Sequence, residues 1–459
     1  MKPGTTCAKL TLAFFLGSCL GMPASATPPT EEIAKRADAY LQARTEDGTF
    51  SGTVLLARGG VPIFVKGFGF SDEAARLRNT ARTRYPIASI TKPFTAMLVM
   101  KLQQQGHLDI GKSICTYLDP CPVLWRPITL RHLLLHTSGI PDYAKLPDFS
   151  RKMREPRTLA QLIGEFRGRP LEFTPGARYS YSNSGYVLLG AILEKASGRK
   201  YAQLLQESIF TPLGMRDSGL DANGPAKPKL AIGYRPDGLR NARAEDLDPS
   251  WLYAAGGIYS TVEDLLKWER AIISGSVLPR ETLERMWSPE HGAYGFGWQL
   301  MKASPQSLNR TLVFHAGGTS GYATDFLHYP QEQVTIILLA NLLPVPLAEI
   351  SRDLSAIMFG ESFAMPAVRK PAQVDPALYD EYVGTYQLAP NVDISVAREG
   401  DRLTVQATGQ PKDVAIPESA TTFYSRISPV RISFMRDGAG NVSRLILHQP
   451  GGDTPAARK

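Results

Sequence analysis

A serine and a lysine three residues apart stand where an apolar, strand-like stretch, Tyr85 to Ala88, gives way to a predicted helix. Ser89 comes first, and Lys92 follows in the first helical turn. A helix begins with free backbone N–H groups and the positive end of its dipole, and both stabilise negative charge on a nearby oxygen. At this spacing the lysine amine reaches the hydroxyl and, when deprotonated, can activate it as a nucleophile. The alternative is an ordinary N-cap serine beside a solvated lysine.

The helix after Ser89 is predicted from an apolar face that ends at Gly106 and consists of Phe94, Met97, Leu98 and Leu102. A second pair with the same spacing, Ser197 and Lys200, follows a helical pattern. Because Gly198 is its predicted C-cap, that serine faces the negative end of the dipole. We therefore take Ser89 as the candidate nucleophile.

Two further short motifs follow along the chain. Tyr181-Ser182-Asn183 stands just ahead of a strongly apolar helix, and His315-Ala316-Gly317 begins a glycine-rich turn. On its own, the first motif is explained by aromatic packing and an asparagine N-cap.

His132 and His136 lie four residues apart on a predicted helix, Leu130 to His136, and this spacing can bind zinc. The three residues between them are leucines, so no acid is available as a base or a further ligand. We therefore predict a structural role, in which His136 bonds to the turn after the helix. No convincing metal-ligand cluster or P-loop occurs elsewhere, and we predict no cofactor.

Two strand patterns early in the chain and four late ones predict a single antiparallel sheet. The early strands, Gly52 to Ala57 and Pro62 to Phe70, follow a helical pattern from Glu31 to Arg44. The late strands are Tyr294 to Leu300, Thr311 to His315, Tyr322 to Tyr329 and Val334 to Asn341. Helical patterns fill the sequence between the two sets. The chain is therefore expected to leave the sheet, build helices and return, which is an α+β fold.

From residue 375 onward the sequence consists of short alternating runs separated by glycine turns. This pattern predicts a small all-β domain, a barrel or sandwich, over residues 375–450. We expect residues 27–365 to form the main domain, residues 366–374 a linker and residues 451–459 a disordered tail. The all-β segment has one histidine, His448, and none of the motifs, so we expect no catalytic group there.

The N-terminus has two lysines, an apolar run from Leu10 to Met22 and the small residues Ala24-Ser25-Ala26, which together predict a secretory signal peptide over residues 1–26. The apolar run is too short for a stable membrane span. The sequence Leu16-Gly17-Ser18-Cys19 also resembles a lipoprotein cleavage box, which would place a lipid anchor at Cys19. We expect a secreted or periplasmic protein, with a lipoprotein as the lesser alternative.

Cleavage after Ala26 would remove Cys7 and Cys19 and leave Cys115 and Cys121, an even pair that predicts a disulfide in an exported protein. The loop between them is short, so the bond would stabilise a local turn and would not define the fold. The formal net charge is +8 at pH 7, but the basic residues are scattered. We therefore expect no nucleic-acid partner.

The order of the motifs is informative: Ser89-x-x-Lys92, then Tyr181-Ser182-Asn183, then His315-Ala316-Gly317. It resembles the penicillin-recognising serine hydrolases, whose members carry S-x-x-K, then S-D-N or Y-x-N, then K-T-G or H-x-G. Within that group the chain looks most like class C β-lactamases and their esterase, D-aminopeptidase and DD-carboxypeptidase relatives. The likeness covers about residues 30–360 and includes the stretches Leu133–Ile140, Phe173–Gly176, Pro212–Met215, Gly256–Thr261 and His315–Gly321.

The resemblance implies a β-lactamase/transpeptidase-like fold: an antiparallel sheet flanked by helices, an all-helical lobe, and a site in the cleft between them. It also implies that Ser89 attacks a carbonyl carbon while Lys92 and Tyr181 relay the serine proton.

By the same resemblance, Asn183 orients Lys92 and the substrate, and His315 and Gly317 line the substrate side. The backbone N–H groups of Ser89 and Gly318 would form the oxyanion hole. His315 stands where many β-lactamases carry a lysine. Because a mostly neutral imidazole holds a substrate carboxylate less firmly than an ammonium does, we expect ester or peptide hydrolysis to exceed β-lactam hydrolysis.

Two classes of function fit these residues. The first is an exported serine hydrolase that forms an acyl-enzyme on small-molecule or peptidoglycan-derived substrates, namely esters, D-amino-acid peptides or amides, or β-lactams. The second is a non-catalytic envelope binding or scaffold protein that has kept the fold. The intact set of Ser89, Lys92 and Tyr181 favours the enzyme, and the absence of a G-x-S-x-G sequence disfavours an α/β-hydrolase. The sequence predicts no particular oligomeric state.

Overall fold

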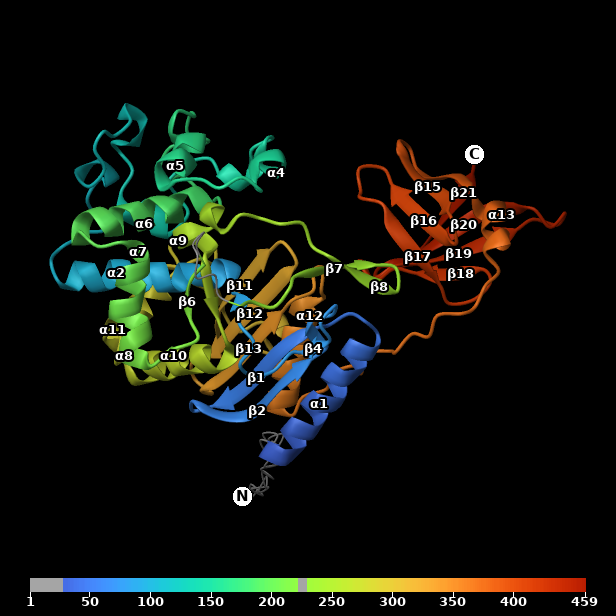
Figure 1. Ribbon diagram of the computed structural model, residues 1–459, viewed down its shortest axis with the longest axis horizontal. Helices are drawn as coiled ribbons and strands as arrows, with labels where there is room; N and C mark the ends of the chain where they lie inside the picture. Colours follow the sequence, from blue (N-terminus) through green and yellow to red (C-terminus); the bar gives the residue numbers. More distant parts are fainter. Residues whose placement is uncertain (1–27, 222–228) are drawn as a thin grey trace, which may run out of the picture.

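A six-stranded antiparallel sheet forms the centre of the main domain in the computed structural model of the protein (Figure 1). The structure describes residues 28–221 and 229–459, so the predicted signal peptide and Cys19 lie outside the described residues. The strand order is β10-β11-β12-β13-β1-β2. The bounds are β1 Gly52–Arg58, β2 Val61–Phe68, β10 Gln299–Met301, β11 Leu312–Thr319, β12 Tyr322–Tyr329 and β13 Val334–Ala340. The predicted α+β fold, with early and late strands in one sheet, is confirmed.

The centre of this sheet is buried on both faces, which explains its continuous apolar runs. Successive residues of β1 point to opposite sides, so Val54 belongs to one core and Leu55 to the other. The helices α1, Thr30–Glu46, and α12, Leu347–Phe359, cover the Val54 side. The helices α2, Thr91–Gln104, and α10, Val262–Ser274, cover the Leu55 side, where the larger core lies.

A helical lobe lies beyond α2, at the top left of Figure 1. Its main helix, α6 (Asn183–Ser197), is buried along most of its length. The other helices from α3 to α11 are α3 Leu130–Leu134, α4 Phe149–Lys152, α5 Leu159–Arg167, α7 Tyr201–Leu205, α8 Thr211–Leu213, α9 Tyr253–Gly256 and α11 Arg280–Met286. Short strands connect these parts: β3 Phe70–Asp72, β4 Leu77–Arg78, β5 Tyr85–Pro86, β6 Gly219–Leu220, β7 Tyr234–Asp237, β8 Arg240–Arg243 and β9 Ile258–Ser260.

The C-terminal segment folds into a closed barrel of eight antiparallel strands, β14 to β21 (Figure 1). The strands are β14 Gly384–Ala389, β15 Val392–Glu399, β16 Arg402–Ala407, β17 Asp413–Pro417, β18 Thr422–Tyr424, β19 Arg431–Arg436, β20 Val442–Gln449 and β21 Gly452–Arg458. A short helix, α13 (Tyr379–Tyr382), precedes them. Aromatic side chains fill the interior, and Tyr382 stacks on Phe434 with ring centroids 4.1 Å apart.

The disordered tail predicted for residues 451–459 is wrong, because β21 occupies it. This strand pairs with β20 from Gly452 to Ala457 and with the start of the barrel at Tyr386 and Gln387 of β14. Closing a barrel satisfies the backbone groups of both edge strands, and that gain outweighs the weak strand propensity of the glycine- and proline-containing sequence.

Three arginines hold the barrel against the main domain. The guanidinium of Arg369 forms an ion pair with Asp47, 2.5 Å away. Arg402 pairs with Asp237 in the β7–β8 hairpin, which reaches toward the barrel in Figure 1. Arg426 donates to the carbonyl oxygens of Gly48, Gly238 and Arg240. The barrel therefore rests on the end of α1 and on this hairpin.

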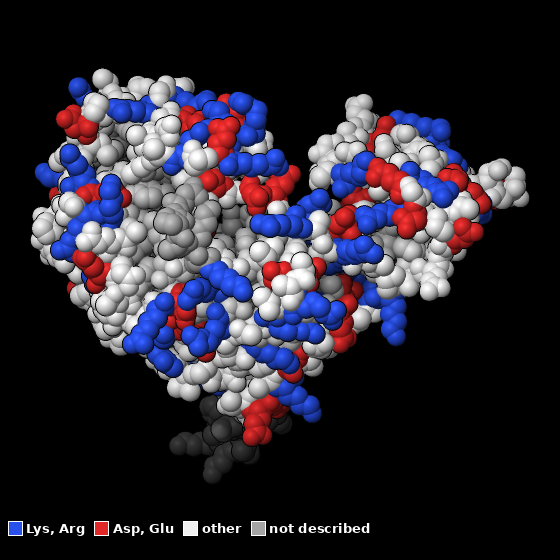
Figure 2. All heavy atoms as spheres, viewed as in Figure 1, with Lys and Arg blue, Asp and Glu red and all other residues white. Residues whose placement is uncertain are grey.

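Charges of both signs are mixed over the face of the molecule in Figure 2, and no stripe of basic residues runs across it. A notch separates the barrel from the helical lobe in the same view. Within residues 28–221 and 229–459, no helix combines the length and apolar character needed to cross a bilayer.

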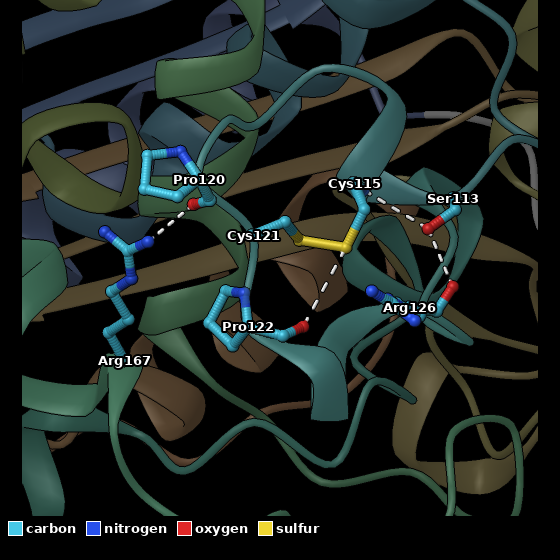
Figure 3. Close-up of a disulfide and its surroundings, with 7 residues drawn as sticks. All are labelled: Ser113, Cys115, Pro120, Cys121, Pro122, Arg126 and Arg167. Atoms are coloured by element: carbon cyan, nitrogen blue, oxygen red, sulfur yellow. Dashed lines mark hydrogen bonds between the residues drawn. A yellow bond between two sulfur atoms is a disulfide. The ribbon is translucent and has the colours of Figure 1, made fainter.

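The structure joins Cys115 and Cys121 by a disulfide in a loop of the helical part of the main domain (Figure 3). Hydrogen bonds hold the loop on both sides of the bond. Arg167 of α5 donates to the carbonyl oxygen of Pro120, and Ser113 donates to that of Arg126. The disulfide thus reinforces a turn that other contacts already define.

Replacing both cysteines by serine is expected to lower the free energy of unfolding by about 2 kcal/mol, because a short closed loop is released in the unfolded chain. Urea unfolding, followed by circular dichroism, measures this loss. In protein purified without reductant, both thiols should resist alkylation until a reductant is added. Free thiols in that preparation would show that the pair is not oxidised.

Candidate active site

Ser89 lies in a short 3-10 turn, Ala88–Ile90, between β5 and the start of α2. The N-cap of α2 is Ile90, and no side chain caps this helix, so the serine hydroxyl is not used as a cap. Backbone and side-chain bonds hold the turn from two directions: Ile87 donates its N–H to Ile258 of β9 and accepts a bond from the Thr324 hydroxyl of β12. The ordinary N-cap interpretation of Ser89 is therefore wrong.

The side chain of Lys92 is completely buried, and its amine contacts three oxygens. Nζ lies 3.0 Å from Ser89 Oγ, 2.9 Å from Asn183 Oδ1 and 2.7 Å from the carbonyl oxygen of Ala255. Burial lowers the pKa of Lys92 to about 7, although the nearby Asp142 carboxylate opposes this shift. At neutral pH a large share of the amine is therefore neutral and able to accept a proton.

Tyr181, two residues before the start of α6, also contacts this serine. Its hydroxyl donates to Ser89 Oγ at 2.9 Å, and the Lys92 amine lies 4.8 Å from the centre of its ring. Burial raises the pKa of Tyr181, so the phenol stays protonated in the resting protein. Of the two partners of Ser89, the lysine amine is therefore the one that can take up a proton.

Asn183 is the first residue of α6, and its two amide atoms have different partners. Oδ1 accepts a bond from Lys92, while Nδ2 donates to both carboxylate oxygens of Asp142, at 3.2 and 3.3 Å. The backbone N–H of Asn183 also donates to Asp142. Asp142 is 5 % exposed and follows the Ile140-Pro141 turn. It fixes the amide so that the oxygen faces the lysine.

His315 is buried in β11, and both of its ring nitrogens have partners. Nδ1 lies 2.7 Å from the carbonyl oxygen of Ala316, which can only accept, so Nδ1 carries the proton. Nε2 therefore accepts from the Tyr294 hydroxyl at 2.9 Å. Burial and the charge of Lys92 lower the pKa of His315 to about 3, so the ring is neutral.

Two glycines end β11 beside the serine turn. A Cβ at Gly317 would lie 2.4 Å from Thr324 Oγ1 and 2.5 Å from the carbonyl oxygen of Ile87, so only glycine permits this close approach. A Cβ at Gly318 would meet no atom within 4 Å, so its position is open. The glycines thus let β11 lie directly against the turn that carries Ser89.

The structure brings four predicted residues into one hydrogen-bonded cluster: Ser89, Lys92, Tyr181 and Asn183. His315 borders this cluster, with its ring 6.5 Å from that of Tyr181. The disulfide pair belongs to a separate loop. The described residues contain no group of three or more potential metal ligands, and the ring Nδ1 of His132 accepts the backbone N–H of Thr129 in a capping box.

Sequence reasoning missed three contributors to the cluster. Asp142 follows a recognised turn, but nothing in its spacing links it to Asn183. Tyr294 is one of many aromatic residues, and its contact with His315 arises only in the folded chain. The carbonyl oxygen of Ala255 is a backbone atom, which no side-chain pattern can indicate.

The chain belongs to the β-lactamase family, whose sequence profile matches residues 37–356, and it is a serine hydrolase. It is 30% identical over 441 residues to penicillin-binding protein 4* of Bacillus subtilis, an alignment that covers 90% of this chain and 96% of that protein. A domain of unknown function, DUF3471, matches residues 368–456.

Solved structures agree with this assignment. The octameric penicillin-binding protein homologue from Pyrococcus abyssi superposes with a TM-score of 0.63 at 25% identity, over 92% of this chain and 99% of that one. A D-stereospecific amidohydrolase from Streptomyces sp. superposes with a TM-score of 0.58 at 26% identity, over 73% of this chain and all of that one.

The reaction of Ser89 with a fluorophosphonate is expected to speed up as the pH rises through about 7, because the Lys92 amine accepts the serine proton only when it is neutral. In Asp142→Asn the midpoint should move to lower pH, since the charge that raises the pKa of Lys92 is gone. Stopped labelling reactions at a series of pH values measure both midpoints. Asp148→Asn, an exposed change in the same lobe, is the control and should leave the midpoint in place. If the midpoint of Asp142→Asn stays in place, Asp142 does not raise the pKa of Lys92.

Proposed function

We propose that this serine hydrolase works through an acyl-enzyme on Ser89, with Lys92 and Tyr181 moving the protons. The observation that carries the proposal is that Ser89 Oγ contacts both the buried amine and the phenol. The neutral amine of Lys92 takes the serine proton, directly or through Tyr181, as the oxygen attacks the carbonyl carbon. The same proton then goes to the leaving group as its bond to the carbonyl carbon breaks.

Deacylation repeats these steps with water in place of serine. The amine accepts a proton from water, the hydroxide attacks the acyl carbon, and Ser89 leaves and regains its proton. Asn183 keeps the Lys92 amine aimed at Ser89 during both halves, because Asp142 fixes the amide orientation. This arrangement needs no group other than the side chains already in place.

The backbone N–H groups of Ser89 and Gly318 are the proposed oxyanion hole. The close approach of β11 to the serine turn, which Gly317 permits, supports this assignment. Two N–H donors that face the developing oxyanion are worth roughly 3 kcal/mol each in enzymes of this kind.

We propose that esters or D-amino-acid peptides and amides are better substrates than β-lactams. His315 is neutral, and both of its nitrogens are occupied, so it offers no cation to a substrate carboxylate. The similarity to a D-stereospecific amidohydrolase supports the same choice.

The predicted signal peptide and the disulfide together support export to an oxidising compartment. The barrel contributes no residue to the cluster around Ser89, so we propose that it is an accessory domain. The proposed boundaries are residues 27–365 for the hydrolase domain, 366–374 for the linker and 375 onward for the barrel.

Ser89 should become covalently labelled by a fluorophosphonate, and Ser89→Ala should lose the label. In Lys92→Ala and Tyr181→Phe the turnover of an ester should fall about a hundredfold or more with the fold retained, since each loses a proton-transfer partner. Peptide mapping by mass spectrometry locates the label. Ser197→Ala is the matched control, because Ser197 shares the serine–lysine spacing but donates its hydroxyl to the carbonyl oxygen of Leu193. A label that maps to another residue would refute the assignment.

A substrate panel tests the preference for esters and amides over β-lactams. Short-chain nitrophenyl esters and D-amino-acid amides are expected to be hydrolysed with a higher kcat/KM than nitrocefin, because the neutral ring of His315 offers no positive charge to the lactam carboxylate. Ser89→Ala gives the background for each substrate. Nitrocefin hydrolysis faster than that of every ester and amide would reverse the ranking.

A further inference from the structure

His136 accepts a hydrogen bond from each of the two residues that flank Tyr181. Its carbonyl oxygen accepts the backbone N–H of Ser180 at 2.9 Å, and its ring Nδ1 accepts the backbone N–H of Ser182 at 3.1 Å. Two bonds from one residue to the positions before and after the tyrosine fix the backbone from which that side chain projects. The direction of the Tyr181 hydroxyl is therefore tied to His136.

The imidazole ring of His136 also packs against the tyrosine itself. The two ring centroids are 4.3 Å apart, and Tyr186 and Tyr294 enclose the histidine at 5.0 and 4.6 Å. His136 is 1 % exposed, so this aromatic cage is closed to bulk solvent. Tyr181 can therefore swing away from Ser89 only by disturbing the His136 ring.

The backbone of His136 has the conformation that this double contact requires. The helix α3 ends at Leu134, two residues before the end predicted for it, and His136 has a φ of +56°. A left-handed conformation is strained for a residue with a side chain. Such strain persists where surrounding contacts hold it in place. Here it turns the carbonyl group and the ring toward the same segment, Ser180 to Ser182.

The ring itself has no means of carrying a proton in the reaction. Nδ1 uses its lone pair on the Ser182 N–H, so in the neutral ring Nε2 holds the hydrogen. Among the described residues, Nε2 has no hydrogen-bond partner. Burial and the charge of Lys92 keep the pKa of His136 well below its usual value. The ring is thus a fixed acceptor and a packing surface.

We infer that His136 is a positioning residue that holds the Tyr181 hydroxyl on Ser89. The inference rests on the proposed roles of Ser89 and Tyr181, and it gives His136 a specific task beyond bonding to the turn after its helix. It also predicts which feature of the ring matters most, namely the acceptor that faces Ser182.

A double-mutant cycle between His136 and Tyr181 tests the inference, with the rate of Ser89 labelling by a fluorophosphonate as the readout. His136→Phe keeps a ring but loses the acceptor, and it should slow labelling about tenfold in the otherwise native protein. In the Tyr181→Phe background the same change should cost less than about twofold, because the hydroxyl that it positions is already gone. The labelling rate of His136→Ala is measured in the same two backgrounds and should show the same difference. Equal losses in both backgrounds would mean that His136 only supports the fold, and the inference would be wrong.

Rescue by a smaller acceptor separates positioning from general packing. Asparagine tolerates a positive φ and offers an amide oxygen close to the place of Nδ1, so His136→Asn should label within about threefold of the native rate. Native KM with a lowered kcat in His136→Phe is expected for ester turnover. A loss in His136→Asn as large as that in His136→Phe would contradict the role given to the acceptor.

The matched control is His132→Asn, in helix α3 four residues before His136. The ring of His132 accepts a backbone N–H in the capping box of α3, and among the described residues it forms no hydrogen bond to Ser89 or Tyr181. Its replacement should lower the melting temperature slightly and leave labelling unchanged. If Tyr181→Phe alone labels at the native rate, the proposed relay fails and this inference fails with it. If Tyr181→Phe is slow but the cycle shows no coupling, the relay stands and only the inference fails.

Discussion

The burial of one amine is the constraint on which the rest of the site depends. Lys92 is inaccessible to water, and a charged amine in such a place is costly unless oxygens surround it. Its three oxygen partners come from the serine turn, from the start of α6 and from α9. Helix α2 and the helical lobe must therefore pack closely before the Lys92 amine has all three hydrogen-bond partners. This packing keeps the pKa of Lys92 near neutrality, where a proton can move in either direction.

Around this amine, the polar groups form a chain in which each member fixes the next. Asp142 orients Asn183, and Asn183 orients Lys92. Aromatic rings close the remaining sides. His136 contacts the rings of Tyr181, Tyr186 and Tyr294, and Tyr294 contacts the ring of His315. A low local dielectric strengthens each bond in such a chain and makes the loss of any single partner expensive. His136 and His315 stay neutral for a related reason: burial and the charge of Lys92 lower the pKa of both rings.

Local sequence patterns predicted the features that depend on residues close together in the chain. The spacing of Ser89 and Lys92 on a helix, the strands of the sheet and seven of the eight barrel strands follow from periodicity and turn residues. The features that were missed depend on contacts between distant segments. Asp142 meets Asn183 only when the helical lobe folds, and β21 forms because a barrel needs a last strand. The β7–β8 hairpin contains a proline and several charged residues, which are poor strand signals, and its contacts with Arg402 and Arg426 of the barrel arise only in the folded chain.

The pairing of β1 with β13 has a consequence for the order in which the protein can assemble. Gly52 of β1 pairs with Ala340 of β13, so the middle of the sheet joins segments from opposite ends of the main domain. During synthesis, β1, β2 and α2 are made before the late strands. The apolar faces of these early elements stay uncovered until the late strands pack against them. Contacts this distant in sequence slow folding and leave partly folded chains prone to association. A chain that ends before β13 lacks the strand that joins β12 to β1, so the sheet behind the Ser89 turn is completed only late in synthesis.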